Sequence, residues 1–112
     1  MTRLEVMIDP ERLDALQQQL ADEGHSGLVV TNARGEIPGE GSVGSFRGSI
    51  YPIHFRERCK VELVVPDPLV EQIVWAIREV CFPGDDGDGK IFLSTVTDAI
   101  RIRTGERGNW AL

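Results

Sequence analysis

The sequence has few of the residues that build disulfide frameworks, metal sites or membrane spans. It holds two cysteines, Cys59 and Cys81, which are too few and too far apart for a disulfide framework or a zinc site. No apolar run approaches the roughly 20 residues of a membrane helix. The formal net charge of −6 disfavours general nucleic-acid binding, which requires a basic surface. We therefore expect a cytoplasmic protein that neither binds nucleic acid nor inserts directly into a membrane.

The remaining composition is typical of one globular domain. Of the 112 residues, 41% are hydrophobic and 27% are charged, and this length supports one core but not two. Residues 1–8 alternate and include an acid, unlike a signal peptide. We expect residues 1–112 to form a single domain.

Two β-α-β patterns follow one another along the chain. In each, an alternating or apolar strand precedes an Asp-Pro pair, which supplies a helix cap and a proline at the first helical position. These pairs are Asp9-Pro10 and Asp67-Pro68, and Gly24 is a natural end for the first helix. The expected strands cover residues 2–8, 27–31, 60–66 and 90–96.

This order predicts an α+β fold, a ferredoxin-like βαββαβ sandwich with helices on one face of an antiparallel sheet. Alternation places Cys59 and Cys81 on the helix side as buried free thiols. The other face of the sheet must also be covered, and self-association with closed symmetry is the usual solution. We therefore expect a homo-oligomer.

An unusually long segment, residues 33–58, separates the second and third expected strands. Loops of this length are either functional or disordered. Its second half, residues 45–55, is richer in apolar residues and could form a hairpin or a partner-binding tip.

A glycine-rich turn at residues 84–92 is the strongest local signal. Its glycines permit a backbone that points several N–H groups at an anion, and Lys90 adds a charge suited to phosphate. If residues 101–103 form a strand, Arg101 and Arg103 project from the same face. Together these residues predict a phosphate cradle. The alternative is a polar surface turn followed by a salt-bridged strand.

Several of these motifs together resemble the PII (nitrogen regulatory P-II) signalling proteins. The residues that carry the resemblance are Gly87–Phe92, Ile100–Glu106, Phe46–Gly48 with Tyr51, and Val61–Asp67. The resemblance runs from Leu4 to about Glu106. It implies a homotrimer with adenine nucleotides in clefts between subunits, and a long T-loop at about residues 36–57 that contacts partner proteins. It also implies a phosphate-binding turn at about 82–90 and a C-terminal segment at 104–112.

The resemblance also implies particular site residues. Those expected to bind the nucleotide are Gly35, Pro38, Glu62, Val64, Gly87, Asp88, Gly89, Lys90, Arg101 and Arg103. Those expected at a second effector are Gly39, Gly41 and Arg58. Those expected to contact a partner through the T-loop are Phe46, Arg47 and Tyr51, where Tyr51 stands at a position that some relatives uridylylate.

The chain departs from the family pattern at the loop base. Pro38, Gly39 and Glu40 stand where the family usually has a basic residue, a glutamine and another basic residue. Gly39 has no side chain to help hold magnesium, which needs well-placed oxygen ligands. We therefore expect ADP or AMP to be favoured over ATP, without magnesium, and 2-oxoglutarate sensing to be weakened.

An arginine, Arg58, replaces the lysine usual at the loop base. Its planar fork suits a planar oxyanion such as bicarbonate. In this respect the chain is similar to divergent PII-like proteins found with carboxysomes and bicarbonate transporters, which sense inorganic carbon. The alternative is that Arg56 and Arg58 are solvated charges at a strand edge.

The main interpretation is a non-enzymatic sensor that controls a membrane transporter or an enzyme through its T-loop. One alternative is a nitrogen-regulatory PII protein that senses ATP and 2-oxoglutarate. A small phosphohydrolase is disfavoured, since His25 follows a helix end, His54 lies in the long loop, and neither pairs with a nucleophile. A purely structural oligomer would leave the phosphate residues unexplained.

Overall fold

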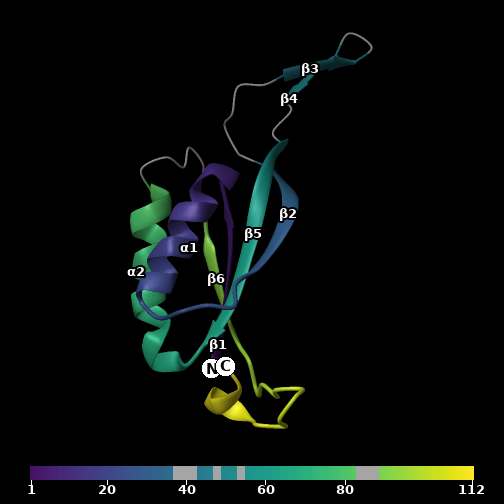
Figure 1. The fold of residues 1–112 in the computed structure, drawn as a ribbon. Helices are drawn as coiled ribbons and strands as arrows, with labels where there is room; N and C mark the ends of the chain where they lie inside the picture. The colour runs from purple at the N-terminus through teal and green to yellow at the C-terminus, as the bar shows by residue number, and fades with distance from the viewer. Residues whose placement is uncertain (37–42, 47–48, 53–54, 83–88) are drawn as a thin grey trace.

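A four-stranded antiparallel sheet with two helices on one face forms the main body of the computed structural model (Figure 1). The structure describes residues 1–36, 43–46, 49–52, 55–82 and 89–112. In spatial order the strands are β2 (Val29–Glu36), β5 (Phe55–Val65), β1 (Thr2–Ile8) and β6 (Ile91–Thr95). The helices are α1 (Leu13–Asp22) and α2 (Val70–Cys81). This arrangement is α+β and ferredoxin-like, so the predicted fold class is confirmed.

The core lies between the helices and one face of the sheet. Alternate residues of each strand share a face, and β1 pairs with β5 so that Leu4 lies opposite Leu63 and Val6 opposite Val61. These side chains pack against those of α1 and α2 and are removed from water. Burial of each large aliphatic side chain stabilises the fold by roughly 1.5–3 kcal/mol. The fully buried large side chains are Leu4, Ile8, Leu16, Leu20, Val61, Ile73 and Ile77.

The two cysteines are part of this core. Cys59 on β5 and Cys81 at the end of α2 are both buried, and neither forms a disulfide bond. The prediction of two buried thiols outside any disulfide, on the helix side of the sheet, is therefore confirmed.

Asp9 begins the first helical segment as predicted. Its carboxylate accepts a hydrogen bond from the Glu11 backbone N–H at 2.9 Å, and a 3-10 turn, η1 (Pro10–Arg12), leads into α1. After α1, Gly24 has a φ of 86°, a left-handed conformation that glycine adopts readily. Both ends of the segment were therefore readable from the sequence.

The same Asp-Pro pair behaves differently before α2, and the predicted Asp67 cap is wrong. Asp67 is the first residue of the 3-10 turn η2 (Asp67–Leu69), and Pro66 occupies the cap position without a side-chain hydrogen bond. The Asp67 carboxylate instead accepts a hydrogen bond from Thr2 Oγ1 at 2.6 Å and lies 3.2 Å from the Met1 amino group. It ties β1 to the start of α2.

The strands beside the long loop extend further than predicted. β2 continues to Glu36 and β5 begins at Phe55, so these two residues lie opposite each other in the sheet. Beyond them a two-stranded hairpin, β3 (Val43–Phe46) and β4 (Ser49–Pro52), lies apart from the sheet and the helices (Figure 1). The predicted hairpin in the second half of the loop is confirmed, although it begins at Val43.

The predicted strand at Arg101–Arg103 is wrong. Residues 102–104 form a turn, in which the Gly105 N–H donates to the Arg101 carbonyl at 2.7 Å and Gly105 has a φ of 75°. A single bridge joins Ile100 to Arg107, and a 3-10 turn, η4 (Gly108–Ala111), follows. The sequence alternates like a strand, but the glycine and the contacts around it close the chain into a turn.

Candidate functional site

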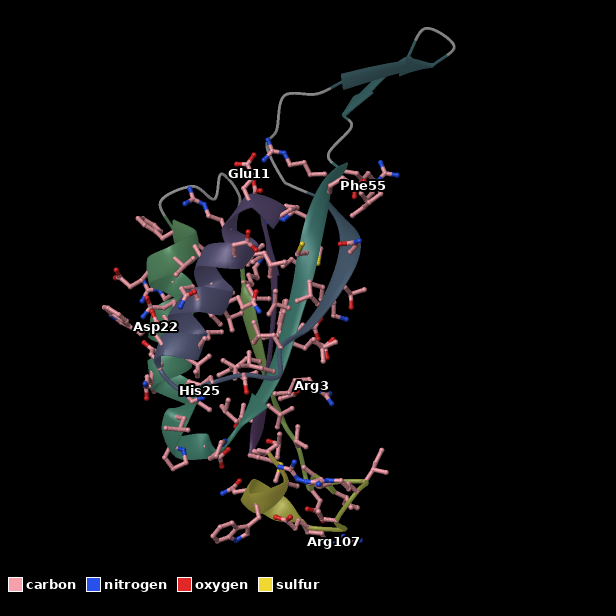
Figure 2. The ribbon with its side chains drawn as sticks, viewed as in Figure 1. Arg3, Glu11, Asp22, His25, Phe55 and Arg107 are labelled. Atoms are coloured by element: carbon pink, nitrogen blue, oxygen red, sulfur yellow. The ribbon has the colours of Figure 1, made fainter. Side chains whose placement is uncertain are left out.

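The sheet face opposite the helices carries charged side chains at the centre of the sheet. Because Glu5 lies opposite Glu62 on neighbouring strands, both project from this open face, as does Lys60. Lys60 Nζ lies 3.1 Å from Glu62 and 3.5 Å from Glu5, and Arg3 Nε lies 3.9 Å from Glu62. Figure 2 shows Arg3 on the side of the sheet away from the helices. Lys60 therefore offsets two carboxylates on adjacent strands.

The pKa of Lys60 is raised above its ordinary value by these neighbours. The hydrogen bond to Glu62 is the largest cause, followed by the charge of Glu5. Lys60 is therefore a stable cation that fixes the orientation of Glu62. The prediction that Glu62 lies off the core is confirmed, and Val64 is half-buried on the same face.

Gly35 and Arg58 meet where β2 and β5 approach the long loop. Arg58 is 6% exposed, and its Nη2 donates to the Met7 carbonyl of β1 at 3.1 Å. A Cβ on Gly35 would lie 2.8 Å from Met7 Cε and 3.1 Å from Arg58 Cγ, so the β2 backbone approaches these side chains too closely for any other residue to fit without movement. The alternative in which Arg58 is a solvated edge charge is therefore wrong, and Arg56 is half-buried.

Lys90 lies near the same end of the sheet. Val6, next to Met7 on β1, pairs with Ile91, the residue that follows Lys90. Gly89 contributes to the wall of a hollow of about 190 Å³ between α2 and β6, and both Gly89 and Lys90 are exposed. The loop base and the lysine of the glycine turn therefore lie at the same end of the sheet, on either side of β1.

Arg101 and Arg103 lie beyond the opposite end of β6. The five residues of β6 span about 16 Å, and the turn that carries these arginines continues away from Lys90 beyond them, so a single copy keeps the arginines and Lys90 apart (Figure 1). Both side chains are exposed. The cradle that the residues alone predicted is therefore not assembled within one chain.

The turn that carries these arginines is held closed at its base by Asp98. Its Oδ1 accepts hydrogen bonds from the backbone N–H groups of Ala99 at 2.9 Å and Gly108 at 3.1 Å. Its Oδ2 accepts one from Arg107 Nη1 at 2.8 Å, and Figure 2 shows Arg107 in this C-terminal segment. The pKa of Asp98 is lowered from its ordinary value of 3.8, first by Gly108 and then by Ala99.

Several predicted site residues lie outside the described part of the chain. These are Pro38, Gly39, Gly41, Arg47, Gly87 and Asp88. Phe46 belongs to β3, and Tyr51 belongs to β4 opposite Gly44. The nucleotide-binding and partner-binding roles given to these residues remain predictions.

Sequence reasoning missed three residues that shape these contacts. Met7 accepts the Arg58 hydrogen bond, Lys60 joins Glu5 to Glu62, and Asp98 closes the arginine turn. The alternation of β1 and β5 could have placed Lys60 beside Glu62. The contacts to Met7 and Asp98 depend on register and on main-chain groups, which the sequence does not specify locally.

The described residues contain neither a metal-binding cluster nor a membrane-spanning helix. No group of three or more histidine, cysteine, aspartate or glutamate side chains in this part of the chain could hold a metal ion. None of its helices combines the length and apolarity required to cross a membrane.

These features define a ferredoxin-like sandwich with an extended hairpin and separated basic groups at two ends of its sheet. Comparison with known proteins identifies the family. Residues 1–106 match the model of the family described as "Nitrogen regulatory protein P-II". The chain belongs to this family and is a regulatory protein.

Relatives match over the full length. A protein named "Nitrogen regulatory protein P-II" from Haemophilus influenzae is 44% identical over 112 residues, which is all of both chains. Proteins of the same name from Rhodospirillum rubrum and Nostoc punctiforme are 41% and 39% identical, again over all of both chains. The predicted resemblance is confirmed, and these relatives carry the nitrogen-regulatory name.

Proposed function

We propose that this protein is a nitrogen-regulatory signalling protein whose effector, an adenine nucleotide, binds between two copies of the chain. The observation that carries the proposal is the position of its basic groups. Lys90 precedes β6, whereas Arg101 and Arg103 follow it at the other end, and all three are exposed. A closed ring of copies would set the lysine of one copy beside the arginines of the next.

The open face of the sheet supports the assembly that this site requires. Phe92, which lies opposite Glu5, is 62% exposed, and Val29, which lies opposite Glu62, is 60% exposed. Exposed apolar groups of this size on a sheet face favour burial against another surface. A homotrimer would cover them and would bring the nucleotide between neighbouring subunits.

The signal that the protein senses is inferred from the names of its relatives and from the residues at the loop base. Nitrogen regulation is better supported than inorganic-carbon sensing, because the full-length relatives carry the nitrogen-regulatory name. The residues at 38–40 still argue for ADP or AMP over magnesium–ATP, because Gly39 offers no side-chain ligand to a metal. A second effector, 2-oxoglutarate or bicarbonate, would lie near Gly39, Gly41 and Arg58. The T-loop, with its β3–β4 hairpin, would carry the signal to a membrane transporter or an enzyme.

Calorimetry tests the ligand directly. The protein is titrated with ATP, ADP and AMP, each with and without magnesium, 2-oxoglutarate and bicarbonate. Arg101→Ala and Arg103→Ala should each weaken nucleotide binding roughly 10- to 100-fold, because each removes a charged hydrogen-bond donor to phosphate. Arg12→Ala, on the helix side of the molecule, is the matched control. The proposal fails if no nucleotide binds, and steady phosphate release that tracks the protein would favour a phosphohydrolase.

A mixing experiment tests whether the site lies between copies. Lys90→Ala protein and Arg101→Ala/Arg103→Ala protein should each bind nucleotide weakly. Co-assembled in equal amounts, they should regain roughly one quarter of the sites, the chance that an intact lysine meets intact arginines in a cyclic assembly. Absence of any recovery in verified mixed assemblies would place the site within a single copy.

A further inference from the structure

The outer face of α2 carries two large aromatic side chains that the core does not use. Trp75 is 59% exposed and Phe82, directly after the helix, is 81% exposed, with Arg78 and Glu79 between them. These four residues line one hollow of about 210 Å³, and we call them the α2 stripe. Arg78, Glu79 and Phe82 follow Trp75 by three, four and seven residues, and this spacing places all four on one side of the helix.

The opposite side of α2 already packs on the sheet. Its buried residues are Val70, Ile73, Ala76, Ile77 and Cys81. The α2 stripe is therefore not required to hold the helix in place, and the helix itself lies on the side of the sheet away from the open face (Figure 1). Two of its residues, Arg78 and Phe82, also line the hollow that contains Gly89, so the α2 stripe adjoins the candidate nucleotide site.

The chemistry of the α2 stripe is that of a docking surface. Tryptophan and arginine are enriched among the residues that contribute most to protein–protein binding. Two exposed aromatic side chains on one side of the helix leave apolar area in water that association would remove. The arginine and the glutamate between them can pair with charges on an incoming surface.

The order of these residues is self-complementary. Consider two antiparallel α2 helices related by a twofold axis that passes between Arg78 and Glu79. Trp75 then lies opposite the partner's Phe82, and Arg78 lies opposite the partner's Glu79. Both aromatic pairs and both charge pairs are matched at once, as a contact between identical surfaces requires. A uniformly acidic or basic partner would instead set a like charge against Glu79 or Arg78.

We propose that the α2 stripe docks against the α2 stripe of a second copy of this chain. The contact is small, because each aromatic side chain buries about 150–250 Å² at most and a stable interface needs about 1,200 Å² or more in total. It is therefore weak between single copies. It gains strength where each assembly presents several stripes, because later contacts then form at a high effective concentration.

Sedimentation velocity over a wide concentration range provides the test. The wild-type protein should double the mass of its smallest assembly as concentration rises. Trp75→Ala should raise the dissociation constant of this step roughly tenfold or more. Arg78→Glu should abolish the step, because it sets two carboxylates opposite each other. Arg12→Glu, with the same charge change elsewhere, should leave it unchanged.

Exchanging the charges of Arg78 and Glu79 tests the antiparallel twofold contact specifically. In Arg78→Glu/Glu79→Arg protein each new charge again meets its opposite across the twofold axis, so the doubling should return. Because Trp75, Arg78 and Glu79 are exposed and Arg12 is only half-buried, circular dichroism should show every variant folded. The proposal is overturned if the wild type shows no doubling, or if the exchanged protein fails to regain what the single substitution lost. The readout is the mass of the assembly and not nucleotide binding, so this proposal can fail or succeed independently of the proposed function.

Discussion

At the scale of single residues, Asp98 governs how the C-terminal segment turns back. Because the folded chain lowers its pKa, the stabilisation it contributes is fully present above the ordinary value of 3.8 and is lost as pH falls through the lower folded value. Carboxyl NMR should therefore give a titration midpoint for Asp98 below 3.8. Exchange protection of the Gly108 amide should fall with the same midpoint.

Arg107→Ala provides the control for this prediction. The N–H groups of Gly108 and Ala99 lower the pKa of Asp98 more than Arg107 does, so the variant should keep a midpoint below the ordinary value. A full return to that value would mean that the ion pair, and not the backbone, holds the turn.

Gly35 is the second residue whose identity matters. A methyl group there would press on Met7 Cε and Arg58 Cγ, and Arg58 is held by its hydrogen bond to Met7. Met7 Cε is the end of a flexible side chain that can move aside, so Gly35→Ala should destabilise the fold by no more than about 1 kcal/mol in urea unfolding, the low end of the usual overpacking cost. Met7→Ala removes one of the two obstructing groups, so the double variant should lose less than the sum of the singles. Strict additivity would contradict the contact.

At the scale of elements, the two Asp-Pro pairs offer a matched comparison. Asp9→Ala should cost about 1 kcal/mol and should speed exchange of the Glu11 amide, because it removes a helix cap. Asp9→Asn keeps an acceptor and should cost less. Asp67→Ala should not change amide exchange at the start of its own helical segment, because the Asp67 side chain caps no N–H group there. Equal loss of amide protection at both helix starts would refute this distinction.

These two pairs also show how far local sequence determines structure. Asp9 accepts a hydrogen bond from the helix start that follows it, whereas Asp67 lies within reach of Thr2, a residue brought to it by the β1–β5 pairing. The dipeptide specifies a helix start in both cases, but the partner of the carboxylate depends on tertiary contacts. The sequence therefore predicted the order of helices and strands, and it could not predict this bond.

Strand ends and the arginine turn follow the same logic. Residues 33–36 are polar or small and give no apolar alternation, yet they extend β2 because β5 offers them a continuous ladder. Arg101 to Arg103 alternate as a strand would, yet Asp98 and Gly105 close them into a turn. Local pattern sets the type of an element where its own side chains are buried, and neighbours decide it elsewhere.

At the scale of the whole molecule, the open face of the sheet should control assembly. Phe92→Ser removes an exposed aromatic side chain without adding charge opposite Glu5. Light scattering of dilute protein should show a smaller assembly or a larger share of monomer, because apolar burial drives association. Trp75→Ser removes an aromatic side chain from the helix side and should leave this basic assembly intact. An unchanged mass for Phe92→Ser would mean that the open face does not assemble.

The pairing of Glu36 with Phe55 has a consequence for the reach of the T-loop. Neighbouring strands lie about 5 Å apart, so both ends of residues 37–54 are pinned side by side at the edge of the sheet. A chain that must leave and return to one point extends at most about half its contour, which is roughly 30 Å for this segment. Any partner that binds the tip of this segment must therefore come within about 30 Å of the sheet edge at Glu36 and Phe55. A partner bound at the tip, as proposed above, would lie within short range of the sheet.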